Sequence, residues 1–178
     1  MVLLEKILEY DINCPVCNSV LKISDYLYEI PFYGKIIISS GVCSKCKYKW
    51  SDVRLAESRG PVKIKFKVSN VEDLNTLVIK SSTCTIKIPD LGAEIIPGYD
   101  SHGYITTIEG IILSLYEKVE FMCSSSNSPN CLEKLDLIKK ALNGEIEFTI
   151  ELIDPMGVSK ILSEKSIEEI IEKHEDEI

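Results

Sequence analysis

The chain has 178 residues, of which 45% are apolar and 27% charged, so it can form a packed core and is not a disordered protein. Its formal net charge is −8, which disfavours nucleic acid as a partner because phosphate backbones are also negative. No run of 18 apolar residues is present, and the short, acidic start does not have the form of a signal peptide. We therefore expect a cytoplasmic protein without a membrane partner, and seven cysteines fit that reducing compartment better than a secreted disulfide framework.

Two Cys-x-x-Cys pairs lie near the N-terminus, Cys14 with Cys17 and Cys43 with Cys46. Each two-residue gap lets both thiols turn inward, and two such pairs supply the four thiolates of a closed, tetrahedral structural zinc site. The 25 residues between the pairs exceed the usual interval of about 15–20 because the loop contains strands of its own. Redox dithiols or a pair of disulfides are the alternatives, but the matched pairs favour one structural zinc, which would supply much of the folding free energy of so small a module.

The residues around the cysteines predict a zinc ribbon of three antiparallel strands. Strands are expected at 21–30 and 35–42, joined by a turn at 31–34, and a third at 47–53 follows the second cysteine pair. Residues 1–11 fit either a helical stripe or a strand that leads into the first pair. The breakers Ser-Arg-Gly-Pro at 58–61 predict a module boundary, so the ribbon with its N-terminal lead-in is assigned to residues 1–58.

The pattern from Val62 onward predicts a second, β-rich domain. Apolar residues alternate with lysines through residue 68, as in a half-buried antiparallel strand. Short strands are expected at 76–80, 84–88 and 93–96, with a turn at 89–92, and another alternating strand covers 146–152 before a turn at 154–157. Several short strands at this spacing predict a sandwich or a barrel.

A helical hairpin is expected between these strands, at about residues 106–143. Thr106 and Glu109 have the spacing of a capping box, and apolar residues then recur at helical intervals through residue 122. A serine-rich loop at 124–128 follows. Ser128 is the expected cap of a second helix that has Pro129 at its first position and ends at Gly144.

The C-terminal segment, residues 163–178, is expected to be an acidic helix or tail. Ser166 and Glu169 have capping spacing, and isoleucines follow at helical intervals.

Three further cysteines lie outside the zinc pattern. Cys123 and Cys131 lie at the facing ends of the two expected helices, where a disulfide is geometrically conceivable but disfavoured in a reducing compartment. Cys84 lies within an expected strand and is most simply a small buried apolar residue.

The sequence contains no recognisable catalytic pattern. It has no glycine-rich phosphate loop, no nucleophile elbow and no His-x-x-x-His pair, and its two histidines, His102 and His174, are far apart in the chain. The glutamates at 145, 147 and 151 are most simply the solvated face of a strand. We expect neither an enzyme nor a small-molecule substrate.

Aromatic residues in two turns are candidates for binding a partner protein. Phe32 and Tyr33 lie at the expected hairpin turn of the ribbon, where they either fold back on the ribbon or stand out as binding anchors. Tyr99 and His102 lie in the irregular segment 97–103, for which an ordinary loop is the simpler account. Lysines 45, 47 and 49 beside Trp50 are expected to be a solvated strand face, with RNA contact as the alternative.

The zinc pattern and several later motifs together resemble the Zpr-type zinc-finger proteins. The shared motifs are Cys-Pro-Val-Cys at 14–17, Ile-Pro-Phe-Tyr at 30–33, Ile-Ile-Ile-Ser-Ser at 36–40, Cys-Ser-Lys-Cys at 43–46, Val-Ile-Lys-Ser at 78–81, Ile-Pro-Asp-Leu at 88–91, Gly-Tyr-Ile-Thr-Thr-Ile-Glu-Gly at 103–110 and Asp-Pro-Met-Gly at 154–157. The resemblance covers about residues 10–162 and has one copy of the module, as in the archaeal members. One departure is that the family has Asn then Ser after the last glycine, whereas this chain has Val158 before Ser159.

The resemblance implies a fold and a partner. The fold is mainly β with α: the zinc ribbon, then a double-stranded β-helix of jelly-roll type at 59–162 that carries the inserted helical hairpin. Zpr-type proteins bind translation elongation factor one-alpha and assist its folding, so the implied function is a zinc-dependent, non-catalytic adaptor or dedicated chaperone of that factor. The alternatives are a zinc ribbon that contacts RNA or the translation and transcription machinery directly, and an enzyme that uses the β-helix cavity.

Overall fold

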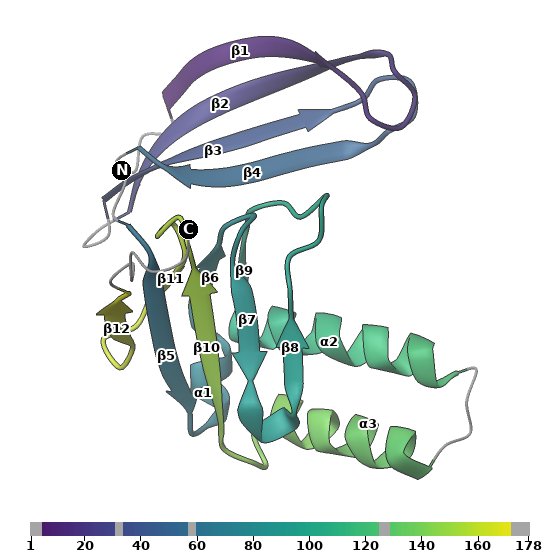
Figure 1. The fold of residues 1–178 in the computed structure, drawn as a ribbon, viewed down its shortest axis with the longest axis vertical. Coiled ribbons are helices and arrows are strands. Elements are labelled where there is room, and N and C mark those ends of the chain that lie inside the picture. Colours follow the sequence, from purple (N-terminus) through teal and green to yellow (C-terminus); the bar gives the residue numbers. More distant parts are fainter. Residues whose placement is uncertain (1–4, 31–33, 57–59, 125–128, 172–178) are drawn as a thin grey trace, which may run out of the picture.

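The computed structural model describes residues 5–30, 34–56, 60–124 and 129–171, and shows a β-ribbon lying across one end of a β-domain that carries two long helices (Figure 1). The strands are β1 (Glu5–Asn13), β2 (Val20–Ile30), β3 (Gly34–Val42), β4 (Lys49–Leu55), β5 (Val62–Val68), β6 (Leu77–Lys80), β7 (Thr85–Ile88), β8 (Ala93–Ile95), β9 (Tyr104–Thr107), β10 (Phe148–Asp154), β11 (Lys160–Ile161) and β12 (Ile167–Ile170). The helices are α1 (Val71–Leu74), α2 (Ile108–Cys123) and α3 (Pro129–Leu142), and a 3-10 turn covers Pro89–Leu91.

The ribbon is an antiparallel sheet with the strand order β1-β2-β3-β4. The three expected strands are present as β2, β3 and β4, although β4 begins two residues later than predicted because the second cysteine turn extends through Tyr48. The ambiguous lead-in is a fourth strand, β1, whose Tyr10 and Ile12 pack beside the cysteines. The ribbon is therefore larger than the three-stranded sheet predicted from the sequence.

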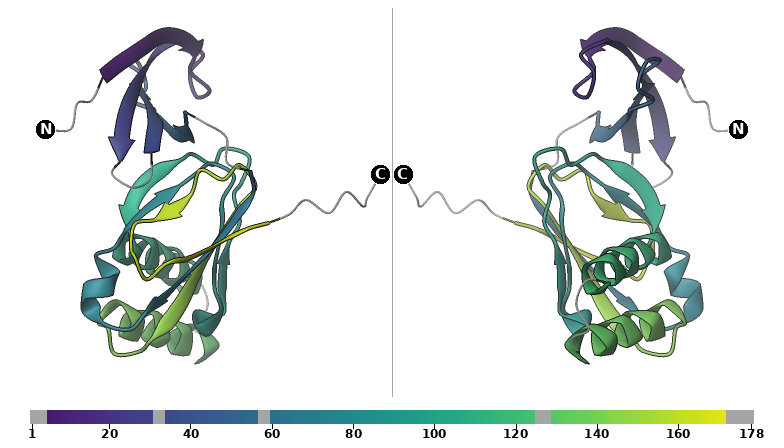
Figure 2. Two further views of the ribbon diagram at one scale, coloured as in Figure 1. Left: turned by 90° about the vertical axis from the view of Figure 1, so that its left-hand side faces the viewer. Right: turned by 90° about the vertical axis from the view of Figure 1, so that its right-hand side faces the viewer.

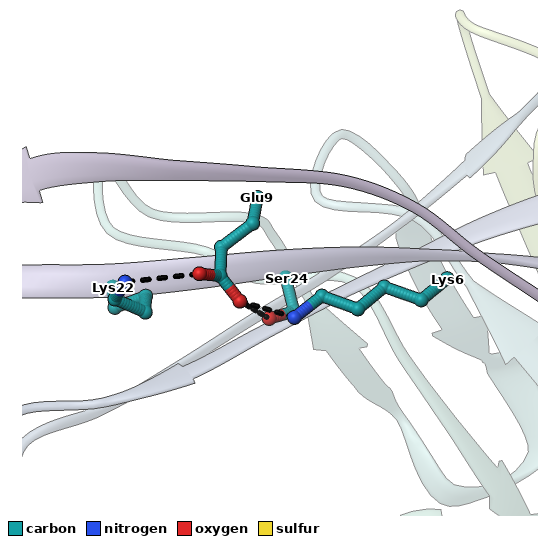
Figure 3. Close-up of polar contacts among 4 residues, drawn as sticks. All are labelled: Lys6, Glu9, Lys22 and Ser24. Carbon is teal, nitrogen blue, oxygen red and sulfur yellow. Dashed lines mark hydrogen bonds and ion pairs between the residues drawn. The ribbon is translucent and has the colours of Figure 1, made fainter.

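Charged side chains link the outer strand β1 to β2 (Figure 3). Glu9 accepts hydrogen bonds from Lys22 Nζ at 2.9 Å and from Ser24 Oγ at 3.4 Å, and it also pairs with Lys6 on its own strand. The hydrogen bonds from Lys6 and Lys22 lower the pKa of Glu9 to about 2, so the carboxylate remains ionised at neutral pH. Glu9 lies opposite Ser24 in the ladder, so these contacts favour this register of β1 against β2.

The β-domain is a sandwich of two antiparallel sheets, one with the order β12-β5-β10-β7-β8 and the other with the order β11-β6-β9. The inward faces enclose the main core, in which Phe66 and Phe148 are the largest fully buried side chains. The outward face of β5 carries lysines that form ion pairs with Glu151 of β10 and with Glu147, which directly precedes β10. These glutamates therefore belong to a salt-bridged strand surface, as their alternation predicted. The jelly-roll fold implied by the resemblance is confirmed.

The N-cap of α2 lies one residue later than predicted. Thr107, rather than Thr106, is the N-cap, and its Oγ1 accepts a hydrogen bond from the Gly110 N–H at 3.1 Å. Both threonines belong to β9, in which Thr106 pairs with Val78 and Thr107, the last residue of the strand, pairs with Leu77. The predicted capping box of Thr106 with Glu109 is therefore wrong, because the helix begins directly after the strand ends at Thr107.

The two long helices lie side by side and extend beyond the sandwich at their joined ends (Figure 1). The predicted apolar stripe of α2 is buried at Ile108, Ile111, Ile112 and Leu115, whereas Met122 near the end of the helix is exposed. The helix α3 begins at Pro129 as expected and buries Ile138, but Leu132 is exposed because it lies in the overhanging part. The predicted cap Ser128 lies outside the described residues. Among the residues that the structure describes, no helix is long and apolar enough to cross a membrane.

The C-terminal segment forms a strand rather than the expected acidic helix. Residues 167–170 pair as β12 with the outer edge of β5, with Glu169 opposite Lys63. Ser166 does not cap a helix; its Oγ donates to the Ser163 carbonyl at 2.7 Å in the turn before β12. Pairing with the open backbone edge of β5 therefore stabilises this segment more than a helix would, despite the local helical pattern. An ion pair between Lys160 and Glu168 adds to the contact.

The remaining cysteines occupy different environments. Cys123 and Cys131 form a disulfide across the helical hairpin, with Cα atoms 5.7 Å apart, so the bond that the sequence made conceivable but disfavoured is present. Cys84 is fully buried, as expected, and burial raises the pKa of its thiol to about 11.

Candidate metal centre and ribbon interface

Two turns at the end of the ribbon bring the four predicted cysteines together. Cys14 and Cys17 lie between β1 and β2, and Cys43 and Cys46 lie between β3 and β4. Their Sγ atoms all lie within 4.8 Å of one another, with 3.5 Å between Cys14 and Cys46 and 3.6 Å between Cys17 and Cys43. A tetrahedral zinc with Zn–S bonds of about 2.3 Å separates its sulfurs by about 3.8 Å. The donor set therefore fits one structural zinc.

The two cysteine turns repeat one backbone geometry. In each, the first cysteine exchanges hydrogen bonds of 2.8–3.0 Å with the backbone of the residues four and five positions later. The fourth residue after it has a positive φ, 58° at Asn18 and 64° at Lys47, which turns the chain back toward the sheet. This repeated turn aims both thiols of each pair at the same point.

The contacts between the sulfurs favour a metal over the alternatives. None of these four cysteines forms a disulfide, and the two close contacts of 3.5 and 3.6 Å run between the two turns. A redox dithiol would instead place the two sulfurs of one motif together. The geometry therefore favours a single shared centre.

Electrostatics also favours a cation among these thiols. The backbone N–H of Cys46 and the hydroxyl of Ser19 lower the pKa of Cys43 to about 5. The backbone N–H of Tyr48 lowers the pKa of Cys46, but burial and the neighbouring thiols together raise it to about 12. Ionisation of one thiol thus disfavours ionisation of its neighbours, because like charges repel. A divalent cation removes this conflict because it stabilises all four thiolates.

The loop between β8 and β9 contacts the ribbon next to the second cysteine turn. His102 Nε2 lies 3.1 Å from Tyr48 Oη, and its ring meets Trp50 edge-on with the centroids 6.2 Å apart. The Gly103 N–H donates to Asp52 Oδ1 at 3.2 Å, and a Cβ at this position would lie 2.5 Å from a backbone nitrogen of β4. A glycine is thus required where the loop approaches the ribbon.

A small apolar cluster completes the contact between ribbon and β-domain, in which the ribbon lies across the end of the sandwich (Figure 2). The ribbon contributes Ile30, Ile36 and Val53, and the β-domain contributes Ile79 and Val158. Val158, which stands where the resemblance has Asn, is thus a buried apolar contact. Packing against the ribbon explains why an apolar residue is present at this position.

A buried aspartate holds the turn that carries Val158. Asp154 at the end of β10 is fully buried, and its carboxylate accepts hydrogen bonds from Thr83 Oγ1 and from the backbone N–H groups of residues 156, 158 and 159. Burial raises the pKa of Asp154, but these bonds, led by those from Ser159, outweigh it and hold the pKa below its ordinary value. The sequence predicted the turn at 154–157, since Asp before Pro at a strand end is a turn signal, but it did not predict that the Asp154 side chain would hold that turn.

The predicted partner-binding residues have different surroundings. Tyr99 is fully exposed, whereas His102 is held against the ribbon by Tyr48 and Trp50. Phe32 and Tyr33 lie outside the described residues. Lysines 45, 47 and 49 are exposed, as expected of a solvated strand face.

Comparison with known proteins agrees with this architecture. A family model for the ZPR1 zinc-finger domain matches residues 6–61, and one for the ZPR1 jelly-roll domain matches residues 72–176. The chain is 34% identical over 172 residues to a ZPR1-like protein of Methanocaldococcus jannaschii, which covers 93% of this chain and 87% of that protein. It is 31% identical over 172 residues to a ZPR1-like protein of Pyrococcus horikoshii, which covers 90% and 77%.

A eukaryotic relative is longer. The zinc finger chaperone zpr1 of Schizosaccharomyces pombe is 33% identical over 157 residues, which cover 83% of this chain but only 34% of the relative. The chain therefore spans about a third of that protein, with one zinc-finger domain followed by one jelly-roll domain. The chain belongs to the ZPR1 family as a single-module member.

Proposed function

We propose that the chain is a non-catalytic, zinc-dependent adaptor or chaperone that binds translation elongation factor one-alpha. The observation that carries the proposal is the continuous contact from the cysteine cluster to an exposed loop of the β-domain. Tyr48 follows Cys46 by two residues and contacts His102, which lies three residues after the fully exposed Tyr99. A chaperone name for the fission yeast relative supports the same function.

The ribbon and the loop together would form a preorganised binding surface. Bound zinc would fix the four thiolates and with them the turn that carries Tyr48. His102 then restrains the loop of residues 97–103, so that Tyr99 is presented with less conformational freedom to lose on binding. The net charge of −8, which four zinc-bound thiolates would make about −10, would steer a basic partner toward the chain.

Calorimetric titration tests this function. The zinc-loaded chain is titrated with the elongation factor of its own source in the nucleotide-free, GDP-bound and GTP-bound states. Saturable binding in at least one state supports the proposal, and its absence from all three contradicts it. A parallel titration with RNA at low and high salt addresses the alternative, for which binding with a steep salt dependence is expected.

A further inference from the structure

An open cavity of about 430 Å³ lies between the loop of residues 96–104, the end of β6 and the helix α2. It is separate from the cysteine cluster, although His102 borders both the cavity and the ribbon. Its walls combine apolar side chains, including Ile96 and Tyr104, with two lysines, Lys80 and Lys118. A concave surface that combines apolar walls with a few polar groups is typical of a binding site.

Lys80 is a buried cation in this wall. Its side chain is only 3% exposed, and Nζ donates to the Ser81 carbonyl at 2.9 Å and to Ser101 Oγ at 3.3 Å, with the Tyr104 ring centroid 5.4 Å away. Within the described part of the chain, no carboxylate lies within ion-pair distance of this ammonium group. The buried Asp154 carboxylate acts on Lys80 only from beyond ion-pair distance. A buried ammonium group without a contacting counterion is costly, so an anion that enters the cavity would gain a strong partner.

The charges around the cavity favour a single negative charge. Lys80 and Lys118 contribute two positive charges, and Asp100 contributes one negative charge to the lining. The net charge of the lining is therefore +1, which matches one carboxylate better than a phosphate, whose charge is about −1.5 to −2.

An apolar surface continues from the cavity along α2. Lys118 also borders a second hollow, together with Glu117, Phe121 and Met122. The two apolar residues, Phe121 and Met122, are 80% and 70% exposed. The cationic cavity and the apolar hollow thus share one residue. A ligand that spans both must carry an anionic group next to a large apolar group, as a peptide segment does.

We propose that this surface binds a carboxylate-bearing peptide segment of a protein partner, with the carboxylate between Lys80 and Lys118 and a neighbouring apolar side chain on Phe121 and Met122. The inference rests on the proposed function in one respect only, namely that the chain binds another protein. It adds the location of the site and the chemical class of the segment.

A peptide titration tests the site without the elongation factor. The zinc-loaded chain, labelled with ¹⁵N, is titrated with the capped tripeptide acetyl-Phe-Ala-Glu-amide, with its Gln counterpart and with inorganic phosphate. The Glu peptide should shift the amide signals of residues 95–104 and of Lys118 in a saturable way. The Gln peptide should bind at least about tenfold more weakly, because a charge-assisted contact is lost. Equal binding of the two peptides, no saturation, or tighter binding of phosphate would overturn the inference.

Variants assign the effect to the two lysines. Lys118→Ala changes an exposed residue and should weaken Glu-peptide binding about tenfold, whereas Lys80→Met removes the buried ammonium and should weaken it further. Lys139→Ala on α3 makes the same charge change outside the cavity and should have no effect. If Lys80→Met does not fold, Lys118→Ala still tests the site, because unchanged affinity of that variant for the Glu peptide refutes it.

The elongation factor separates failure of the site from failure of the proposed function. If the factor binds the wild-type chain and Lys118→Ala equally well, the site is refuted and the proposed function stands. If the factor does not bind the wild-type chain but the Glu peptide binds in a lysine-dependent way, the site stands and the proposed partner is refuted.

Discussion

The substitution Asp154→Asn removes the charge that organises the turn between β10 and β11. Oδ1 accepts from Thr83 Oγ1 at 2.8 Å and from the Met156 N–H at 3.0 Å, and Oδ2 accepts from the Val158 and Ser159 N–H groups at 2.9 and 2.6 Å. Asparagine has one acceptor oxygen, so its NH₂ group must face the donors on one side. The ribbon contact depends on this turn because Val158 packs against the ribbon.

The least costly placement of the amide puts its nitrogen at the Oδ1 position. There the Thr83 hydroxyl can rotate, but the backbone N–H of Met156 loses its acceptor. An unsatisfied buried N–H costs about 1–3 kcal/mol, and each remaining bond loses about 1 kcal/mol when its acceptor is neutral. We expect the free energy of unfolding to fall by about 3 kcal/mol or more, measured by urea denaturation at pH 7 and followed by circular dichroism.

Asp90→Asn is the matched control for this experiment. Its exposed carboxylate accepts one hydrogen bond, from the Thr149 N–H at 2.7 Å, so the loss should stay below about 1 kcal/mol. A loss below about 1 kcal/mol for Asp154→Asn, or one equal to that of the control, would refute the proposed role of this carboxylate in the turn.

Three further predictions concern the pH dependence of Asp154, the close approach at Gly103 and the cysteine cluster. The pKa of Asp154 in the folded chain lies below the unfolded value of about 3.9, so its contribution to stability is present above that pH and is lost as the pH falls through the folded pKa. In urea denaturation, the free energies of unfolding of wild type and Asp154→Asn should therefore converge below about pH 4. A difference that stays constant with pH would contradict this. Gly103→Ala forces a Cβ against β4 and should lower the free energy of unfolding by about 1–3 kcal/mol. Gly98→Ala, which places its Cβ in open space, should not lower it. Equal free energies of unfolding for the two variants in urea denaturation would refute the close approach at Gly103. Chelation of zinc, or Cys43→Ser, should abolish hydrogen-exchange protection in the ribbon before the core of the β-domain, and the opposite order would contradict a structural metal.

Local patterns in the sequence predicted most of the fold because they arise from short-range physics. The alternation from Val62 to Val68 appears as β5 with every second side chain buried, and the two Cys-x-x-Cys motifs meet in one cluster. In both cases the residues that decide the structure are close together in the chain, or are repeated in a recognisable form. The resemblance supplied the jelly-roll arrangement, which spacing alone left open between a sandwich and a barrel.

Long-range contacts decided the features that the sequence did not predict. The pattern around Ser166 and Glu169 indicates a helix, but the open edge of β5, about a hundred residues earlier, pairs with this segment as a strand. His102 is restrained by Tyr48, 54 residues away, and Asp154 by Thr83, 71 residues away. Periodicity within the chain does not predict such contacts, so the roles of His102 and Asp154 follow only from the three-dimensional structure.

The proposed binding surface is tested most directly by calorimetric titration of the zinc-loaded chain and its Tyr99→Ala variant with the elongation factor. We expect saturable binding that Tyr99→Ala weakens by at least about tenfold, the effect expected when an aromatic anchor is truncated. Ile167→Ala, at an exposed site on the distant strand β12, should bind like wild type. Binding that all three chains share equally would contradict the loop as the binding surface, and no binding by the wild-type chain would contradict the proposed partner itself.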